Sequence, residues 1–311
     1  MDGIINIDKP IGKTSFAVVA AIRRLAGERR VGHGGTLDPM ASGVLPVCIG
    51  RGTRVVEFLA EARKTYTAEI TLGVTTDTYD TEGRITQRGD PFGIERETIV
   101  EALKSFQGRV EQRPPMYSAV KHNGRRLYEL ARMGVTVERP LRPANIYRIE
   151  LLNYASPLLT LEVECGKGTY IRSIADDLGR ALGCGAHLTG LVRTAYGPFR
   201  IDDAVSLDGF EAACREGQWQ ELVRPLDIAL ETWPAVIVSD EQGHLIVNGR
   251  LISLDENGLP PEAETGGRLC AYSQEGCLLA VLKFRAESGQ WHPAKVFSRR
   301  QADAVPEILD S

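Results

Sequence analysis

The segment TYTAEITLGV, residues 65–74, constrains the fold more than any other part of the chain because apolar and polar side chains alternate along it. The apolar set is Tyr66, Ala68, Ile70, Leu72 and Val74, and the polar set is Thr65, Thr67, Glu69 and Thr71. A period of two predicts a β-strand with one buried and one solvated face. Tyr66 falls on the apolar face, where a tyrosine is by default a core residue.

Further strands and helices are predicted on both sides of this segment. Residues 146–152 and 157–165 are expected to form a strand pair, and the second member again alternates. Helices are expected at 15–27, 53–62, 95–107 and 125–133, and an apolar stripe predicts one more, over Ile171, Ile174, Leu178, Ala181 and Leu182. Ser15 is the expected N-cap of the first helix, and Gly27 is its stop.

The character of the sequence changes near residues 232–234. From 235 to 298 it offers short strand-like runs broken by Gly and Pro, namely AVIVS, HLIVNG, LCAYS, CLLAVLKF and AKVFS. This pattern predicts a small β-rich C-terminal domain.

Composition excludes several classes of protein. The six cysteines include no CxxC pair and the five histidines are scattered, so neither a disulfide framework nor a metal site is expected. The start has no basic segment leading into an apolar run, and no apolar run approaches membrane length. GKTS at 12–15 lacks the upstream glycine of a phosphate-binding loop, because Ile7 stands there. We therefore expect a cytoplasmic enzyme or binding protein without a cofactor.

The net charge of −4 hides a strong asymmetry along the chain. Residues 104–148 hold ten basic side chains against three acidic ones, whereas residues 201–311 hold nine against nineteen. The basic cluster is compatible with a solvated face or with a site for a polyanion. Tyr117, Tyr128 and Tyr147 lie among the charges and favour RNA or another single-stranded substrate, because unstacked bases can rest on aromatic rings.

The segment VGHGGTLDPMASG, residues 31–43, holds one carboxylate, Asp38, directly before a proline. Its four glycines predict that another group comes close to the backbone. Taken alone, Asp38 before Pro39 indicates a helix N-cap followed by proline at the first helical position. His33 is interpreted as a structural, hydrogen-bonding histidine, since no second metal-type residue lies at a useful spacing.

Arg172, in KGTYIR, lies near the start of a predicted helix, where the dipole gives a cation no advantage. The position therefore predicts a carboxylate partner. If that partner is Asp38, the guanidinium should lower the pKa of the carboxyl by about 1 to 3 units and keep it ionised. An ionised aspartate acts as a nucleophile or as an electrostatic stabiliser.

Five segments carry a family resemblance: NIDKPIGKTS (6–15), GHGGTLDPMASGVLPVCIG (32–50), KTYTAEITLGVTTDTYDTEG (64–83), RPPMYSAVKHNGRRLYELAR (113–132) and KGTYIRSIADDLGRALGCGAHLTGLVRT (167–194). In this order they resemble the TruB family of tRNA pseudouridine synthases, over about residues 4–230. The tail resembles the PUA-type RNA-binding domain more weakly, through VNG (247–249), LLAVLKF (278–284) and WHPAKVF (291–297).

The resemblance implies an α+β (mixed α/β) catalytic domain, residues 1–232, with a central, largely antiparallel sheet. It also implies a basic insertion at about 113–145 that clamps the T stem-loop of tRNA, and a PUA-like domain at 233–311. The implied reaction is isomerisation of a flipped-out uridine to pseudouridine at tRNA position 55, without a metal or cofactor and without an obligate protein partner.

Particular residues take family roles by position. The implied catalytic residues are the nucleophile Asp38, the stacking and proposed base Tyr66, and Arg172, which pairs with the nucleophile. His33, Tyr170, Leu191 and Asp80 are implied substrate-pocket residues, and the glycines of 32–43 leave room for the nucleotide. The clamp is represented by Lys121, Arg125, Arg126 and Arg132. Whether the aspartate attacks C1′, deprotonates C2′ or attacks C6 of the base stays open.

Two alternatives remain at this point. The chain could be a catalytic subunit directed by a guide RNA, although the complete insertion offers its own RNA clamp. It could instead be an RNA-binding or RNA-folding protein without essential catalysis. The joint presence of Asp38, Tyr66 and Arg172 discriminates against that alternative, because a pure binder does not require them.

Overall fold

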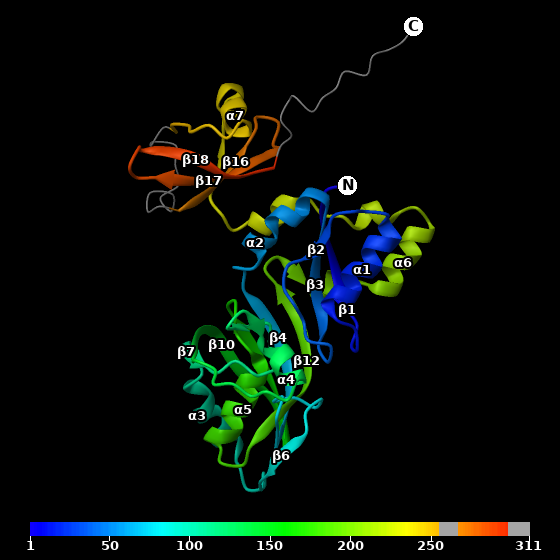
Figure 1. The fold of residues 1–311 in the computed structure, drawn as a ribbon, viewed down its shortest axis with the longest axis vertical. Coiled ribbons are helices and arrows are strands. Elements are labelled where there is room, and N and C mark those ends of the chain that lie inside the picture. Colours follow the sequence, from blue (N-terminus) through cyan, green and yellow to red (C-terminus); the bar gives the residue numbers. More distant parts are fainter. Residues whose placement is uncertain (255–266, 298–311) are drawn as a thin grey trace.

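A large mixed sheet organises the chain in the computed structural model, which describes residues 1–254 and 267–297 (Figure 1). Its order is β14-β1-β3-β12-β4-β11-β10-β7, with β2 paired to β3 and β13 to β12. The strands are β1 (Gly3–Lys9), β2 (Val31–His33), β3 (Ser42–Ile49), β4 (Lys64–Leu72), β7 (Gly108–Gln112), β10 (Arg142–Ala155), β11 (Leu158–Cys165), β12 (Ala186–Tyr196), β13 (Phe199–Arg200) and β14 (Val205–Ser206). Only β1 with β14 and β12 with β3 are parallel among these pairs. The predicted mixed α/β fold with a largely antiparallel sheet is confirmed.

The alternating segment forms β4, hydrogen-bonded between β11 and β12. Ala68, Ile70 and Leu72 are buried as predicted, and Tyr66 is half-buried against the same core. The strand ends at Gly73, where a φ of +85° turns the chain. The next residues begin β5 (Val74–Thr76), which pairs with β6 (Ile85–Arg88) in a separate hairpin.

Helices cover the sheet in two groups (Figure 1). α1 (Ser15–Ala26) packs with α6 (Leu207–Arg215) beside β1, and α3 (Arg96–Lys104) packs with α5 (Ile171–Ala181) beside β10 and β12. Of the apolar stripe predicted for α5, Ile171, Ile174 and Leu178 are buried, whereas Ala181 is exposed and Leu182 is partly buried. Short 3-10 turns connect the remaining elements, at Gly50–Val55, Ile201–Asp203, Trp219–Leu222 and Leu226–Leu230.

Two details of the first two predicted helices are wrong. Thr14, not Ser15, caps α1, because its hydroxyl accepts from the Ala17 amide at 3.0 Å. The Ser15 hydroxyl is engaged elsewhere: it donates to the Leu37 carbonyl at 3.2 Å and accepts from the Leu37 amide at 2.9 Å. The helix expected at 53–62 is reduced to a 3-10 turn followed by the short α2 (Val56–Leu59). Gly27 ends α1 with a φ of +66°, as expected.

The basic insertion contains a small hairpin and a short helix. β8 (Lys121–His122) and β9 (Arg125–Arg126) are joined by a turn at Asn123-Gly124, with φ values of +48° and +83°. α4 (Leu127–Arg132) follows, two residues later than predicted, and begins where the Arg126 amide donates to Glu129 at 3.0 Å. Met116, Leu127 and Leu130 form its core. The insertion therefore has an apolar cluster of its own.

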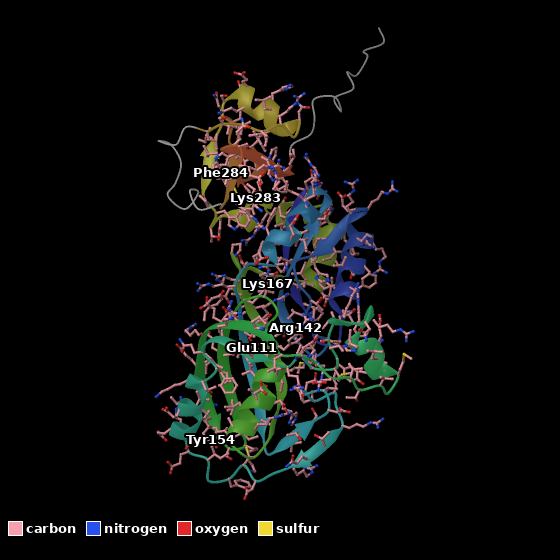
Figure 2. The ribbon with its side chains drawn as sticks, turned by 60° about the vertical axis from the view of Figure 1, so that its left-hand side comes forward. Glu111, Arg142, Tyr154, Lys167, Lys283 and Phe284 are labelled. Atoms are coloured by element: carbon pink, nitrogen blue, oxygen red, sulfur yellow. The ribbon has the colours of Figure 1, made fainter. Side chains whose placement is uncertain are left out.

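A separate four-stranded sheet follows in the C-terminal part, comprising β15 (Ala235–Ile237), β16 (Arg268–Tyr272), β17 (Leu278–Arg285) and β18 (Gln290–Val296). HLIVNG is not a strand. It belongs to α7 (Asp240–Val247), because Ser239 and Gln242 cap each other at its start. Figure 2 labels Lys283 and Phe284 on this sheet, Lys167 near the middle of the molecule and Tyr154 at the opposite end. Residues 255–266 and 298–311 of the expected C-terminal domain lie outside the described residues.

Candidate active site

Five segments that are distant in the sequence meet at one cavity of about 310 Å³. They are the loop 34–38, the start of β4, residues 118–119 and 166–172, and the end of β12. Asp38, Tyr66 and Arg172 all line this cavity, together with Tyr170 and Leu191. His33 and Asp80 are not among its lining residues. The structure thus brings together five of the seven pocket residues expected from the sequence.

Asp38 lies in the connection between β2 and β3 and caps no helix. The Ala41 amide donates to the Asp38 carbonyl at 3.1 Å, which closes a turn over Pro39. Proline suits the second position of such a turn because its φ is preset. The chain must reverse here so that β3 can begin at Ser42, and the helix N-cap prediction is therefore wrong. The Pro39 carbonyl accepts from the Gly12 amide at 2.8 Å, which fixes the turn from outside.

Arg172 has the predicted carboxylate partner. Its Nη2 lies 3.0 Å from Oδ2 of Asp38, and its Nη1 lies 3.2 Å from Oδ2 of Asp80. Nη2 also donates to the Tyr117 carbonyl at 2.8 Å, which ties the guanidinium to the insertion. The Arg172 and Asp80 side chains are almost fully buried, whereas the Asp38 side chain is 35% exposed. Asp38 is therefore the member of this network that is open to a ligand.

The expected lowering of the Asp38 pKa is wrong in direction. Burial raises the pKa of this carboxyl above its ordinary value, and the nearby Asp80 adds to the rise, while Arg172 and Lys9 oppose it. The sequence indicates the charge partner of Asp38 but not how deeply its carboxyl is buried. The effect of burial on the pKa could therefore not be compared with the effect of Arg172. A carboxylate with a raised pKa is more basic than a free one, and it depends on Arg172 to stay ionised.

Tyr66 lines the cavity from β4, which runs between two neighbouring strands. It stands opposite Val163 on β11 and Arg193 on β12. Burial raises the pKa of its hydroxyl, and the Arg193 guanidinium beside it acts against that rise. Burial also raises the pKa of Tyr170, against the influence of the Ser118 hydroxyl. Both tyrosines are therefore favoured as neutral phenols when no ligand is bound.

The two remaining pocket residues predicted from the sequence are structural neighbours of the site. The Nδ1 atom of His33 accepts from the Gly35 amide at 3.2 Å, and burial lowers the pKa of this histidine, an effect to which Arg193 adds. That geometry agrees with the structural interpretation of His33. Asp80 accepts from the Thr78 hydroxyl at 2.5 Å on one oxygen and faces Arg172 with the other.

Three buried cations near the cavity were missed in the sequence. Lys9 donates to the carbonyls of Pro10 and Lys13 at 2.9 and 2.6 Å, and burial lowers its pKa to about 8. Lys64 donates to Ala60 and Ala62 at 2.8 and 2.6 Å, and burial likewise lowers its pKa to about 8. Arg193 is the third. The sequence position of Lys64 could have indicated its burial, because it is two residues before Tyr66 and therefore lies on the apolar face of the strand.

The glycines of the Asp38 loop make room for β12. A Cβ on Gly35 would lie 3.2 Å from the Tyr196 ring, and a Cβ on Gly43 would lie 2.3 Å from the Arg193 carbonyl oxygen. Gly43 also has a φ of +99°, which other residues rarely adopt. The Tyr196 hydroxyl donates to the Gly34 carbonyl. The predicted close approach is real, but the approaching group is the neighbouring strand.

The clamp residues Lys121, Arg125, Arg126 and Arg132 are all exposed on the insertion. The guanidinium carbons of Arg126 and Arg132 lie 5.9 and 5.5 Å from the centre of the Tyr128 ring. Ser118 and Ala119 connect this basic surface to the cavity wall. Positive charge and an aromatic ring thus lie on the segment that borders the site.

Within residues 1–254 and 267–297, no cluster of three or more His, Cys, Asp or Glu side chains could hold a metal ion. None of the helices in the described ranges is long and apolar enough to span a bilayer.

A mixed sheet of this topology carries an Asp–Arg pair and a tyrosine in one cavity, and the family matches define the chain as a pseudouridine synthase. The chain belongs to the TruB family of pseudouridylate synthases, which are isomerases. The model of the N-terminal domain of that family matches residues 23–171, and the model of the tRNA pseudouridylate synthase B C-terminal domain matches residues 172–231.

Relatives and solved structures agree with this assignment. The tRNA pseudouridine synthase B of Dehalococcoides mccartyi is 51% identical over 300 residues, which cover 96% of this chain and 98% of the relative. That of Burkholderia mallei is 41% identical, with 95% and 97% covered. A chain in the crystal structure of a Cbf5-Nop10-Gar1 complex is similar with a TM-score of 0.75 and 31% identity, covering 96% of this chain and 85% of that one.

Proposed function

We propose that this enzyme converts the uridine at position 55, in the T loop of tRNA, to pseudouridine. The observation that carries the proposal is the Asp38–Arg172 pair in the same cavity as the Tyr66 side chain, bordered by a basic insertion. The relatives named tRNA pseudouridine synthase B support tRNA as the substrate.

The reaction breaks the N1–C1′ bond of uridine and forms a C5–C1′ bond, so that C5 loses one proton and N1 gains one. An ionised Asp38 can attack C1′ or remove a proton from C2′, and Arg172 keeps it ionised. Flipping the base out of its stack costs a few kcal/mol. Stacking on the Tyr66 ring returns about 1 to 3 kcal/mol, and we assign the removal of the C5 proton to the phenolate of the same tyrosine.

Tyr170 and Leu191 complete the pocket proposed for the flipped base. Asp80 forms an ion pair with Nη1 of Arg172, the nitrogen that does not face Asp38. His33 positions the loop before Asp38 through Gly35. We further propose residues 1–232 as the catalytic domain and 233–311 as a PUA-like RNA-binding domain. The proposed location is the cytoplasm.

The test of this function is conversion of an unmodified tRNA transcript by the purified protein alone, with pseudouridine located by position. We expect it only at the T-loop uridine, and a transcript with cytidine there should yield none. Activity that appears only after a guide RNA is added would support the guide-directed alternative. Tight binding without any conversion would support the pure RNA-binding alternative.

Removal of Arg125 and Arg126 tests the clamp. The double change to Ala should weaken tRNA binding and reduce the slope of log affinity against log salt concentration by about 2, because each exposed arginine at a phosphate releases about one counterion. Binding would be measured between low and physiological salt. The matched control is Arg24→Ala with Arg215→Ala, which removes two exposed charges from α1 and α6. An equal slope for both double variants would exclude the clamp.

A further inference from the structure

Arg193 is a deeply buried cation that lines the cavity, with 1% of its surface exposed. Its Nε donates to the Val44 carbonyl at 2.7 Å, and its Nη2 donates to the Gly35 carbonyl at 3.2 Å. These two carbonyls lie on either side of Asp38 in the chain: Gly35 precedes the turn at Asp38 and Pro39, and Val44 follows it. A single guanidinium from β12 therefore holds both ends of the loop that carries the nucleophile.

The charge of Arg193 is not neutralised by an ion pair. In the described ranges, no Asp or Glu lies within ion-pair distance of its guanidinium, whereas Arg172 has two such partners. A buried arginine normally has a carboxylate, since burying an uncompensated charge is costly. Its neighbours include the Tyr196 ring, whose centre is 4.8 Å from the guanidinium carbon, and Tyr66, which is its cross-strand partner on β4.

We propose that Arg193 is a positioning residue of the isomerisation, which fixes the Tyr66 hydroxyl relative to the Asp38 loop and keeps a free positive charge beside it. The inference rests on the proposed function, because it assigns to Tyr66 the removal of the C5 proton. Tyr66 first gives its phenolic proton to solvent, its phenolate oxygen then takes the proton from C5, and one proton from solvent goes to N1. The positive charge favours the phenolate that this step needs.

The groups around Tyr66 leave Arg193 as the main source of that effect. Asp38 and Cys165 face the hydroxyl and act against its ionisation, and burial raises the pKa of the Cys165 thiol to about 11. Lys64 shares β4 with Tyr66, but its ammonium is bound to two carbonyls and lies 4.5 Å from the Tyr196 ring centre. Tyr196 on β12 and the more distant His33 and Lys9 are the other titratable groups near Arg193.

The experiment compares Arg193→Gln, which removes the charge, with Arg193→Lys, which keeps it, in single-turnover assays at saturating enzyme from pH 6 to 9. We expect Arg193→Gln to lower the single-turnover rate constant by at least about tenfold. The decrease should be largest at low pH, below the plateau of the pH–rate profile. Arg193→Lys should recover most of the rate. tRNA affinity should change by less than about twofold for both variants. Arg215→Gln, on the exposed face of α6, is the control.

A readout without turnover separates this inference from the proposed function. In protein labelled with 3-fluorotyrosine, the ¹⁹F resonance lost in Tyr66→Phe belongs to Tyr66. Its titration should move to higher pH by about one unit or more in Arg193→Gln, and by much less in Arg193→Lys. An unmoved titration together with an unchanged pH–rate profile would overturn the proposal, whatever the stability of the variant. A shifted titration in a protein that converts no tRNA would contradict the proposed function only.

Discussion

Asp38→Asn is expected to reduce pseudouridine formation by at least about 10³-fold while tRNA binding stays within about twofold of the unchanged protein. The amide has nearly the shape of the carboxylate, but it can neither attack C1′ nor accept a proton from C2′. The turn that holds residue 38 is closed by its main-chain carbonyl, so the loop should keep its form. Conversion would be followed by nucleoside chromatography of digested tRNA, and binding by filter retention.

The control for this experiment is Asp208→Asn, an exposed change of the same kind at the start of α6. It should leave conversion unchanged. Normal turnover by Asp38→Asn would remove Asp38 from the reaction, whereas loss of tRNA binding in step with turnover would assign it a binding role instead.

Arg172→Met is expected to lower both stability and activity. The change leaves Asp38 and Asp80 facing each other without the cation that lies 3.0 and 3.2 Å from them. Loss of one partner from a buried ionic network costs about 3–5 kcal/mol of unfolding free energy. Turnover should fall at least about 10²-fold at neutral pH, because the carboxyl of Asp38 is then harder to ionise.

The sign of the pH dependence follows from the same loss. Without Arg172, the folded-state pKa of Asp38 rises further above its unfolded value, so the folded protein binds more protons in the interval between the two values. Stability then falls as pH rises through that interval. The destabilisation by Arg172→Met should therefore be smaller at pH 5 than at pH 8 in urea titrations. The acid limb of the pH–rate profile should also move to higher pH.

Asp80→Asn combined with Arg172→Met tests the network further. It removes one of the two unpaired charges and should recover part of the lost stability without restoring turnover. Arg172→Met could instead destabilise the protein equally at pH 5 and pH 8, with no recovery in the double variant. That result would mean that the aliphatic part of Arg172 stabilises the fold by packing and that its charge does not.

Sequence reasoning succeeded where a local pattern determines the environment. The alternation of apolar and polar residues placed Tyr66 on the buried face of β4. The position of Arg172 near a helix start, where the dipole does not favour a cation, indicated a carboxylate partner. It failed where the answer depends on how deeply the folded chain buries a group: the pKa of Asp38 is raised because the effect of burial outweighs that of Arg172. Arg193 was missed because only the pairing of β12 with β3 and β4 brings it to the site.

Short segments were misread for a related reason. HLIVNG is apolar enough for a strand, and length alone does not separate a short strand from a short helix. The reciprocal cap between Ser239 and Gln242 decided for α7. Asp38 before Pro39 has the local signature of a helix start, yet the pairing of β3 with β1 required the chain to turn back at once.

The parallel contact between β12 and β3 spans only Val192 with Ser42 and Arg193 with Gly43, yet it joins the two halves of the large sheet beside the loop that carries Asp38. Arg193 and Val44, which are bonded across this junction, are 149 residues apart in the chain. Closing so long a loop carries a large entropic cost and belongs to the slow, non-local part of folding. Helices and hairpins can form earlier, but the catalytic geometry exists only once both halves of the sheet have docked. Regain of activity after denaturation therefore reports completion of the whole topology rather than the first collapse.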